Sequence, residues 1–466
     1  MYRTAFVVFA LVCSVLAIPQ AKVDENIWEK LEQTNNVNVL VTFKKANTKA
    51  AYDRFHSLRL TSREATLNAH YSILKDHADV VQADVTAMLR KIAPGKKHYL
   101  DVLWISNELI VRDADKEVID MLRNHPDVDS LIAEKIIPLE TVTHGNFSVL
   151  DENNIMNQWG VVNVRAPTVW ENGNRGENVV IGIIDTGARV THVALSDTYR
   201  GNPGSNHNYN WFAPAGQLPI PTDTHGHGTH VTGSAAATHG LGVAPGARWI
   251  ACRGCAGAGC ADLDLLSCGN WMACPTTTDN QSPNCSLAPR IVNNSWGGGQ
   301  NNPWYNGIIT AWRNVGIVPV FSVGNSGAIF CASVTSPGDQ PGVVGVSSIS
   351  ENNQISDFTS IGPGPNVSQK PDVAAPGQDI ISASHLYDDE LHGLSGSSMA
   401  APHVAGVAAL ILSNRPYLSV DEVVNALKTG AAPHTPLGRV CFERSDNQRP
   451  NFHVGYGRVD AVNSAR

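Results

Sequence analysis

The sequence predicts an α/β protein in two parts: a small α+β unit, followed by a larger domain with a parallel sheet flanked by helices. From about residue 150 onwards, short apolar runs alternate with helical patterns, which is typical of strands buried on both faces. Residues 22 to about 140 differ, because they contain no cysteine and few glycines. The chain has 466 residues, 42% of them hydrophobic, which suffices for two or three packed domains.

Residues 1–17 have the pattern of a secretory signal peptide. Arg3 supplies the positive charge, residues 5–17 form an apolar run too short to span a bilayer comfortably, and Ala17 offers a small residue for cleavage. A membrane anchor is the alternative, but no later segment has the uninterrupted apolar run of a membrane helix. We therefore expect a secreted, extracellular protein without a membrane partner.

The N-terminal unit should contain four strands and two helices. The apolar pattern predicts a strand over residues 37–43 and a long helix over 66–92. Extended segments follow over 99–112, on either side of Asn107 and Glu108, then a helix over 115–124 and a strand over 128–134. This β-α-β-β-α-β order is a ferredoxin-like arrangement. Pro138 and the polar residues 141–146 predict a linker, so we place one domain at 18–140 and the other at 141–466, with the boundary at about 138–146.

The larger domain should contain buried strands at residues 179–184, 249–252, 317–323 and 343–349. Ligands of such folds bind beyond the carboxyl ends of the strands, so polar residues at those ends are candidates for the site. A helical pattern also begins at Ser398, where unpaired N–H groups favour negative charge. A hydroxyl there can act as a nucleophile beside donors for an oxyanion, although a serine that caps a buried helix is the simpler explanation of this stretch alone.

The charge and the cysteines exclude some functions. The net charge of −8, without any basic cluster, argues against nucleic acid and anionic membranes as partners. Of nine cysteines, one lies in the predicted signal peptide and eight remain. An even number of cysteines in an exported chain predicts disulfides, but the sequence does not tell which cysteines pair. Cys252 and Cys255 have the spacing of half a zinc site, but no second such pair follows. Sequons predict a glycoprotein, with Asn146 and Asn366 at the surface and Asn293 buried; the fourth is at Asn284.

Three motifs compete as the functional site. Asp185, in Asp-Thr-Gly, follows a predicted strand, but an aspartic protease needs two such motifs and the chain has one. His225, His227 and His230 could bind a metal, although no further ligand cluster is evident and His227 precedes a small-residue helix. Taken with Ser398, however, Asp185 and His227 give the order Asp, His, Ser. This is one of the chain orders found in hydrolase triads.

On these residues the chain resembles the subtilisin-like serine proteases, and in particular the bacillopeptidase F branch. The resemblance runs from about Trp159 to the C-terminus, whereas residues 22–140 resemble the inhibitory propeptide of the family more loosely, by element order. The matching stretches are Ile184-Asp185-Thr186-Gly187, His227-Gly228-Thr229-His230-Val231, Asn294-Ser295-Trp296-Gly297-Gly298-Gly299, Ser322-Val323-Gly324-Asn325-Ser326-Gly327, Lys370-Pro371-Asp372-Val373-Ala374-Ala375-Pro376-Gly377 and Gly396-Ser397-Ser398-Met399-Ala400.

The resemblance implies a three-layer subtilisin-like fold and a role for each matching residue. Ser398, directly before a methionine, would be the nucleophile rather than its neighbour Ser397. His227 would be its general base, and Asp185 would orient the imidazole. The amide of Asn325 and the backbone N–H of Ser398 would form the oxyanion hole.

The substrate pocket is also implied by the resemblance. Ser295, Trp296, Gly297 and Gly298 would pair with an extended substrate, and the bulk of Trp296 is expected to narrow or cap the pocket. Thr335 would lie near the pocket floor. We expect a secreted serine endopeptidase that acts on proteins or peptides and is made as a zymogen, with its own propeptide as intramolecular inhibitor.

No cofactor or metal is expected. Ala194 stands where many family members have a calcium-binding aspartate, and residues 235–243 form only a short loop, so the usual first calcium site is not supported. Structural calcium elsewhere stays open. A catalytically silent binding or regulatory protein with the same fold is the alternative function, and a metallohydrolase is the third.

Overall fold

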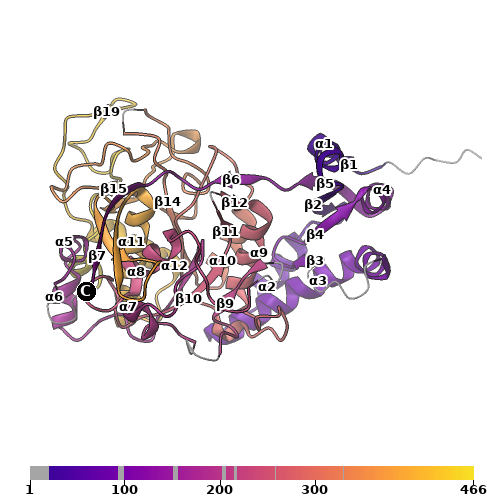
Figure 1. Cartoon of the computed structure of the whole chain (residues 1–466), viewed down its shortest axis with the longest axis horizontal. Helices are drawn as coiled ribbons and strands as arrows, with labels where there is room; N and C mark the ends of the chain where they lie inside the picture. The colour runs from indigo at the N-terminus through magenta and orange to yellow at the C-terminus, as the bar shows by residue number, and fades with distance from the viewer. Residues whose placement is uncertain are drawn as a thin grey trace, which may run out of the picture.

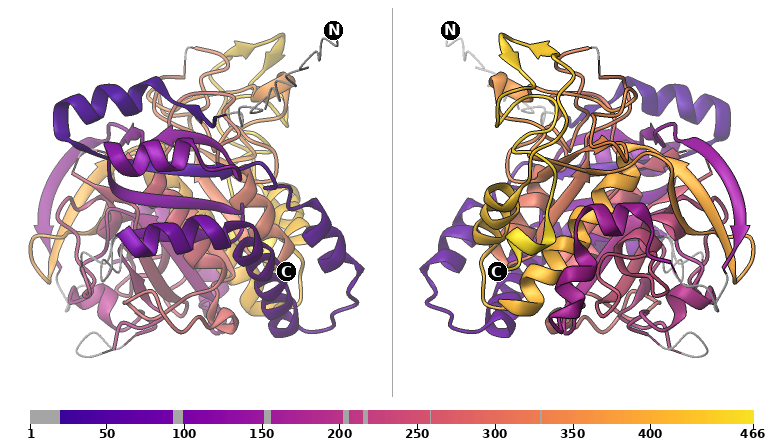
Figure 2. Two further views of the ribbon diagram at one scale, coloured as in Figure 1. Left: turned by 90° about the vertical axis from the view of Figure 1, so that its right-hand side faces the viewer. Right: turned by 90° about the vertical axis from the view of Figure 1, so that its left-hand side faces the viewer.

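The computed structural model describes residues 20–92, 99–150, 156–201, 206–214, 218–257, 259–328 and 330–466. The N-terminal unit lies against one side of the larger domain, and a linker, residues 134–150, crosses from one to the other (Figures 1 and 2). The predicted signal peptide, residues 1–17, lies outside the described residues. Among the residues described, no helix is long and apolar enough to cross a membrane.

The N-terminal unit has the predicted element order with three additions. Its sheet has the order β1-β5-β2-β4-β3, and the last four are antiparallel neighbours as in a ferredoxin-like unit. The additions are β1, α1 and α2. The elements are β1(Lys22–Val23), α1(Glu25–Thr34), β2(Asn36–Phe43), α2(Lys49–Ser57), α3(Arg63–Ile92), β3(Leu100–Leu103), β4(Glu108–Asp115), α4(Lys116–Arg123) and β5(Val128–Ala133).

A parallel sheet of seven strands forms the centre of the larger domain, in the order β16-β15-β14-β13-β8-β10-β9. Four of these strands were predicted, namely β8, β10, β14 and β15. The other three were not. The strands are β8(Val180–Asp185), β9(Trp211–Phe212), β10(Arg248–Arg253), β13(Ile291–Asn294), β14(Val318–Ser322), β15(Val344–Ile349) and β16(Val373–Pro376).

Helices cover both faces of this sheet, which confirms the expected layers. On β8, Ile181 and Ile183 face α8 and α11, whereas Ile184 faces α9 and α10 in a second core. The N-terminal unit packs on that second side, because Leu74 and Trp104 belong to the same core. The helices are α5(Trp159–Asn163), α6(Ala166–Glu171), α7(Val193–Ser196), α8(His227–Ala236), α9(Asp262–Ala273), α10(Asn306–Asn314), α11(Ser397–Asn414), α12(Val420–Gly430) and α13(Ala461–Ser464).

The linker adds a strand to two small sheets of the larger domain. β6(Ile136–Pro138) pairs antiparallel with β12(Gly259–Ala261), which also pairs with β11(Cys255–Ala256). β7(Thr143–Val149) pairs antiparallel with β18(Glu390–Ser395), whose other neighbour is β17(Ile380–Ala383). The linker therefore lies along the larger domain on both sides of residues 139–142. A further hairpin, β19(Val440–Cys441) and β20(Arg444–Ser445), lies near the C-terminus.

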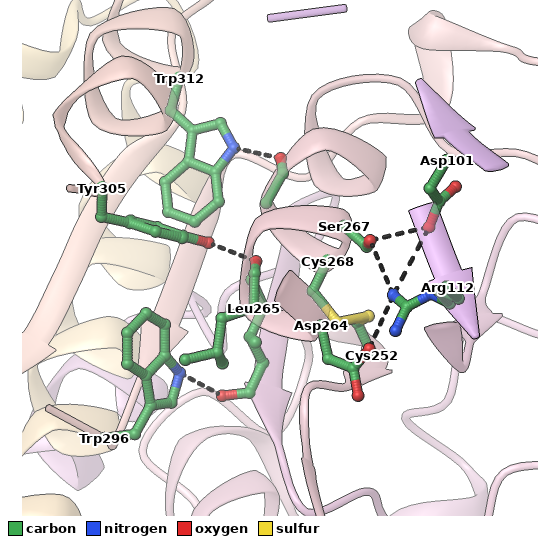
Figure 3. Close-up of a disulfide and its surroundings, with 12 residues drawn as sticks. Asp101, Arg112, Cys252, Asp264, Leu265, Ser267, Cys268, Trp296, Tyr305 and Trp312 are labelled. Atoms are coloured by element: carbon green, nitrogen blue, oxygen red, sulfur yellow. Dashed lines mark hydrogen bonds and ion pairs between the residues drawn. A yellow bond between two sulfur atoms is a disulfide. The ribbon is translucent and has the colours of Figure 1, made fainter. Parts of the chain in front are cut away.

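Four disulfides confirm the prediction made from the cysteine count. They join Cys252 to Cys268, Cys255 to Cys260, Cys274 to Cys285 and Cys331 to Cys441. The first links β10 to α9 close to Asp264 and to Arg112 of the N-terminal unit (Figure 3). Asn293 is buried as expected, and the other three sequon asparagines are exposed.

An ion cluster fixes the N-terminal unit to α9 (Figure 3). The guanidinium of Arg112, on β4, lies 2.8 Å from Asp264 and 3.8 Å from Asp101. It also donates to the hydroxyl of Ser267 at 3.4 Å, and that hydroxyl donates to Asp101 at 2.8 Å. Burial raises the pKa of Asp264 to about 6, although the charge of Arg112 opposes this shift.

A second ion cluster is buried within the larger domain. Asp372 lies 2.7 Å from Lys370 through one carboxylate oxygen and 2.7 Å from Lys428 through the other. The backbone N–H of Gly345 donates to the same carboxylate at 2.8 Å, so the start of β16 is tied to β15. Burial raises the pKa of Asp372, but the two lysines outweigh it and the pKa lies below its usual value.

Candidate active site

Asp185 and His227 form a buried hydrogen-bonded pair at the carboxyl edge of the central sheet. Asp185 is the last residue of β8, and His227 is the first residue of α8, after Gly226 in a left-handed conformation at φ 98°. The Asp185 Oδ1 and His227 Nδ1 atoms are 2.7 Å apart, and both side chains are 1% exposed. Asp185 Oδ1 also accepts the N–H of Thr186 at 2.8 Å. The carboxylate therefore fixes the plane of the imidazole ring.

The second nitrogen of His227 is left available for proton transfer. His227 Nε2 is buried and has no hydrogen-bond partner among the described residues. Burial lowers the pKa of His227, but the charge and hydrogen bond of Asp185 outweigh it, so the pKa lies above its usual value. Asp185 thus makes the imidazole a stronger base, as a general base requires.

Asp223 positions the loop before His227, and it was not predicted from the sequence. Its Oδ1 accepts the N–H groups of His225 and Gly226 at 2.9 and 2.8 Å, and its Oδ2 accepts the N–H of Thr229 at 2.9 Å. Burial raises the pKa of Asp223, but these hydrogen bonds outweigh it and lower the pKa below its usual value. An aspartate three residues before a glycine at a helix start was the available sequence signal.

Ser398 lies in the first turn of α11, which packs beside α8 (Figure 1). Gly396 rather than Ser398 is the N-cap, so the expectation that Ser398 occupies the capping position was wrong. The Ser398 hydroxyl donates to the carbonyl of Ser295 at 3.0 Å, and the Ser295 hydroxyl donates to the carbonyl of Ser398 at 2.8 Å. The structure therefore joins Asp185 to His227 by a hydrogen bond, and Ser398 to the predicted substrate strand.

Ser397 and Asn325 hold each other in place. The Ser397 N–H donates to the side-chain oxygen of Asn325 at 2.9 Å, and the Ser397 hydroxyl accepts the N–H of Gly324 at 3.1 Å. These contacts occupy Ser397 structurally. The side-chain N–H of Asn325 is oriented as a consequence, and it donates to the backbone carbonyl of Thr141 in the linker at 3.0 Å. A donor of this kind can stabilise a carbonyl oxygen that becomes negative.

The predicted substrate strand follows β13, but Trp296 does not cap the pocket. Its ring is fully buried against Tyr305 and Phe321, at centroid distances of 5.3 and 5.4 Å. Its indole N–H donates to the carbonyl of Ile184 at 3.0 Å (Figure 3). The expectation that its bulk narrows the pocket was therefore wrong, because the ring stabilises the end of β8 instead.

Thr335, predicted from the resemblance to lie near the pocket floor, lies beside Gly297 of the predicted substrate strand. A Cβ built on Gly297 would lie 2.9 Å from the Thr335 hydroxyl oxygen, so the strand and Thr335 are in direct contact. Thr335 also donates to Oε1 of Glu140, in the linker, at 3.0 Å. Glu140 was not identified from the sequence, since its position depends on how the linker docks.

The three neighbouring histidines do not converge on one point. His227 is hydrogen-bonded to Asp185, whereas His230 Nε2 lies 2.9 Å from the carbonyl of Ile380 and faces the core. Burial lowers the pKa of His230 to about 3. Across the described parts of the chain, no three histidine, cysteine or acidic side chains are grouped as metal ligands would be.

Comparison with known proteins places these features in one family. Residues 176–457 match the subtilase family. Bacillopeptidase F of Bacillus subtilis (strain 168) is 32% identical over 479 residues, which cover 96% of this chain and 32% of that protein. Subtilisin DY of Bacillus licheniformis is 32% identical over 66% of this chain and 98% of its own length. Subtilisin E of Bacillus subtilis (strain 168) is 30% identical over 66% of this chain and 71% of its own length.

Proposed function

Because this chain belongs to the subtilase family of serine-type endopeptidases, we propose that it hydrolyses peptide bonds of protein substrates through Asp185, His227 and Ser398. The chain spans about a third of the length of bacillopeptidase F, and the proposal concerns the residues present here. The observation that carries it is the 2.7 Å contact between Asp185 Oδ1 and His227 Nδ1, which leaves Nε2 buried and unpaired among the described groups. A general base with this orientation is what a serine nucleophile needs.

The reaction would begin when the Ser398 hydroxyl leaves the carbonyl of Ser295 and turns toward His227. Nε2 accepts its proton as Oγ attacks the substrate carbonyl carbon. The Asn325 side chain and the Ser398 N–H stabilise the oxyanion, and His227 then donates the proton to the leaving amine. Water hydrolyses the acyl-enzyme in the same way. No step requires a metal or cofactor.

We further propose that the chain is secreted as a self-processing zymogen. The pattern of residues 1–17 supports export. Support for an inhibitory propeptide comes from the linker, which pairs with β12 on one side of the site and with β18 on the other. Between these strands the carbonyl of Thr141 accepts the hydrogen bond of Asn325. A segment bound like an extended substrate excludes other substrates until it is cut and released.

A fluorophosphonate probe tests the proposed chemistry. The secreted protein should be labelled at Ser398, and a chelator should not prevent the labelling. Ser398→Ala should abolish labelling and accumulate the uncut precursor. Ser397→Ala is the matched control that should keep both reactions, because alanine retains the backbone N–H that binds Asn325. Absence of labelling in the wild type would favour the catalytically silent alternative. Hydrolysis that is lost with chelator, without labelling, would favour a metallohydrolase.

A further inference from the structure

A polar pocket beside the site holds the side chain of one linker residue, Glu140. Its Oε1 accepts the hydroxyl proton of Thr335 at 3.0 Å. A Cβ built on Gly324 would lie 2.9 Å from that oxygen, and equally 2.9 Å from the Thr335 methyl carbon and the Ser360 hydroxyl oxygen. These three groups therefore converge on the space that the glycine leaves open. A side chain at position 324 would displace Glu140.

The pocket stabilises a neutral carboxyl rather than a carboxylate. Thr335 and Ser360 bring hydroxyl groups to this space, and His227, on α8, is the charged side chain whose effect on Glu140 is resolved. Burial raises the pKa of Glu140 to about 7, despite the opposing effects of the Thr335 hydrogen bond and His227. Its Oε2 is buried without a hydrogen-bond partner within the described ranges. A buried, unpaired oxygen is tolerated better in a neutral group than in a charged one.

The residues after Glu140 decide between two possible cleavage points. Thr141 is exposed and fills no pocket, although its carbonyl accepts the hydrogen bond of Asn325. Val142 is buried, and its side chain lies 3.0 Å from a Cβ built on Gly396. A reacting peptide presents one residue's side chain to the pocket and the same residue's carbonyl to the oxyanion donor. In this structure the pocket holds the side chain of Glu140, but Asn325 binds the carbonyl of the next residue, Thr141, so the linker is shifted by one carbonyl from the arrangement that reacts. Because the side chain in the pocket is that of Glu140, Glu140 is the residue that the pocket selects.

We infer that this pocket selects a glutamine or a protonated glutamate before the cleaved bond, and that the precursor is cut between Glu140 and Thr141. This inference rests on the proposed function and names its substrate class. In the first step Ser398 Oγ bonds to the carbonyl carbon of Glu140, and the bond from that carbon to the Thr141 nitrogen breaks. His227 carries the proton of Ser398 to the Thr141 nitrogen. Water then hydrolyses the ester and leaves a carboxyl group on Glu140.

The new N-terminus of the processed protein tests the cleavage point. Mass spectrometry of the mature wild-type chain should find Thr141 as its first residue. The full precursor carrying Glu140→Gln should be processed at the wild-type rate, whereas Glu140→Lys should slow processing at this bond tenfold or more, because a permanent charge enters a pocket without a counter-charge. A chain that begins at Val142, or Glu140→Lys processing at the wild-type rate, would overturn the inference. Probe labelling of Ser398 reports separately on the proposed function.

Peptide substrates test the pocket itself. In peptide amides that differ only in the residue before the fluorogenic group, glutamine should give a higher kcat/KM than leucine or lysine. The ratio of glutamate to glutamine should fall as the pH rises from about 4.5 to about 7, by up to about tenfold per pH unit, because bound glutamate must carry a proton that free glutamate has lost. Above about pH 7 the ratio should level off. Equal rates for glutamine and leucine, or a ratio independent of pH, would contradict the assignment.

Thr335→Val removes the hydroxyl with little change of shape. It should lower the glutamine-to-leucine ratio about three- to tenfold, the size expected for one neutral hydrogen bond, without abolishing hydrolysis of the leucine peptide. Thr191→Val is the matched control, because the Thr191 hydroxyl donates to Asp388 at 2.6 Å, away from the pocket. The control should leave the ratio unchanged. An unchanged ratio in Thr335→Val, with the leucine peptide still hydrolysed, would refute the role of Thr335.

Discussion

Replacing Arg112 with methionine should release the N-terminal unit from the larger domain about 30- to 150-fold faster. Removing one member of a buried, hydrogen-bonded charge pair at an interface weakens binding by about 2–5 kcal/mol, mainly through the off-rate. Arg112 is 10% exposed and lies 2.8 Å from Asp264, which is 31% exposed. Water can therefore reach part of the stranded carboxylate. The lower end of that range, about 2–3 kcal/mol, is appropriate and corresponds to the stated factor.

The delay before activity appears measures this release. In the proposed zymogen, the N-terminal unit should stay bound after self-cleavage. Hydrolysis of a fluorogenic peptide should then start only as this unit dissociates. Arg112→Met should shorten the delay, whereas Arg54→Met, at an exposed position on α2, is a matched control that should not. Combining Arg112→Met with Asp264→Asn should accelerate release less than the sum of the single effects, because the two groups are in contact. Release within twofold of the wild-type rate, or fully additive effects, would refute this account of the interface.

Three further outcomes follow from other contacts. Asn325→Ala should lower kcat by about 10²- to 10³-fold with little change in KM, because one donor to the oxyanion is worth about 2.7–4 kcal/mol of transition-state stabilisation. A near-normal kcat would rule out Asn325 as an oxyanion donor. Lys370→Met should lower the unfolding free energy by about 3 kcal/mol and lower Tm measurably, because it leaves the buried Asp372 carboxylate with one cationic partner instead of two. Lys428→Met, at the more exposed position, should have a smaller effect, and equal effects in thermal unfolding would contradict this. The N-terminal unit should also dissociate faster at pH 7 than at pH 5. Burial raises the pKa of Asp264 to about 6 in the docked protein, so the stabilisation of the docked state is present below the ordinary pKa and is lost as the pH rises through about 6. Release that slows with rising pH would contradict this linkage.

The elements predicted from the sequence were those whose apolar pattern matched their burial. β8, β10, β14 and β15 each contain an apolar run long enough to predict a strand, and each is a buried strand. β13 was missed because its last two residues, Asn293 and Asn294, are polar although they are completely buried. Asn294 donates to the carbonyls of Val292 and Val320, so hydrogen bonds replace apolar packing there. Residue polarity alone does not reveal such a strand.

The residues of the candidate site were likewise predicted where a local motif marks them and missed where their position depends on distant segments. Asp185 and His227 lie in short motifs at element ends, and the structure brings their side chains into contact; the roles that the resemblance implies for them stay predictions. The orientation of Trp296 was missed because it depends on an aromatic cluster assembled from three separate segments. Glu140 was missed for a related reason. Its environment exists only after the linker docks, so no local pattern of residues 134–150 carries it.

The two strands of the linker also cover strand edges of the larger domain that could otherwise pair with other molecules. Strand edges with unpaired N–H and C=O groups are templates for pairing with other molecules, and β6 and β7 cover one edge each, at β12 and β18. A chain produced without residues 134–150 would present both edges bare before any substrate is available. We therefore expect such a truncated protein to aggregate during refolding, whereas the precursor refolds with its edges covered. The N–H and C=O groups of β12 and β18 would then be paired with the linker in the newly made protein, and we expect this pairing to keep it monomeric.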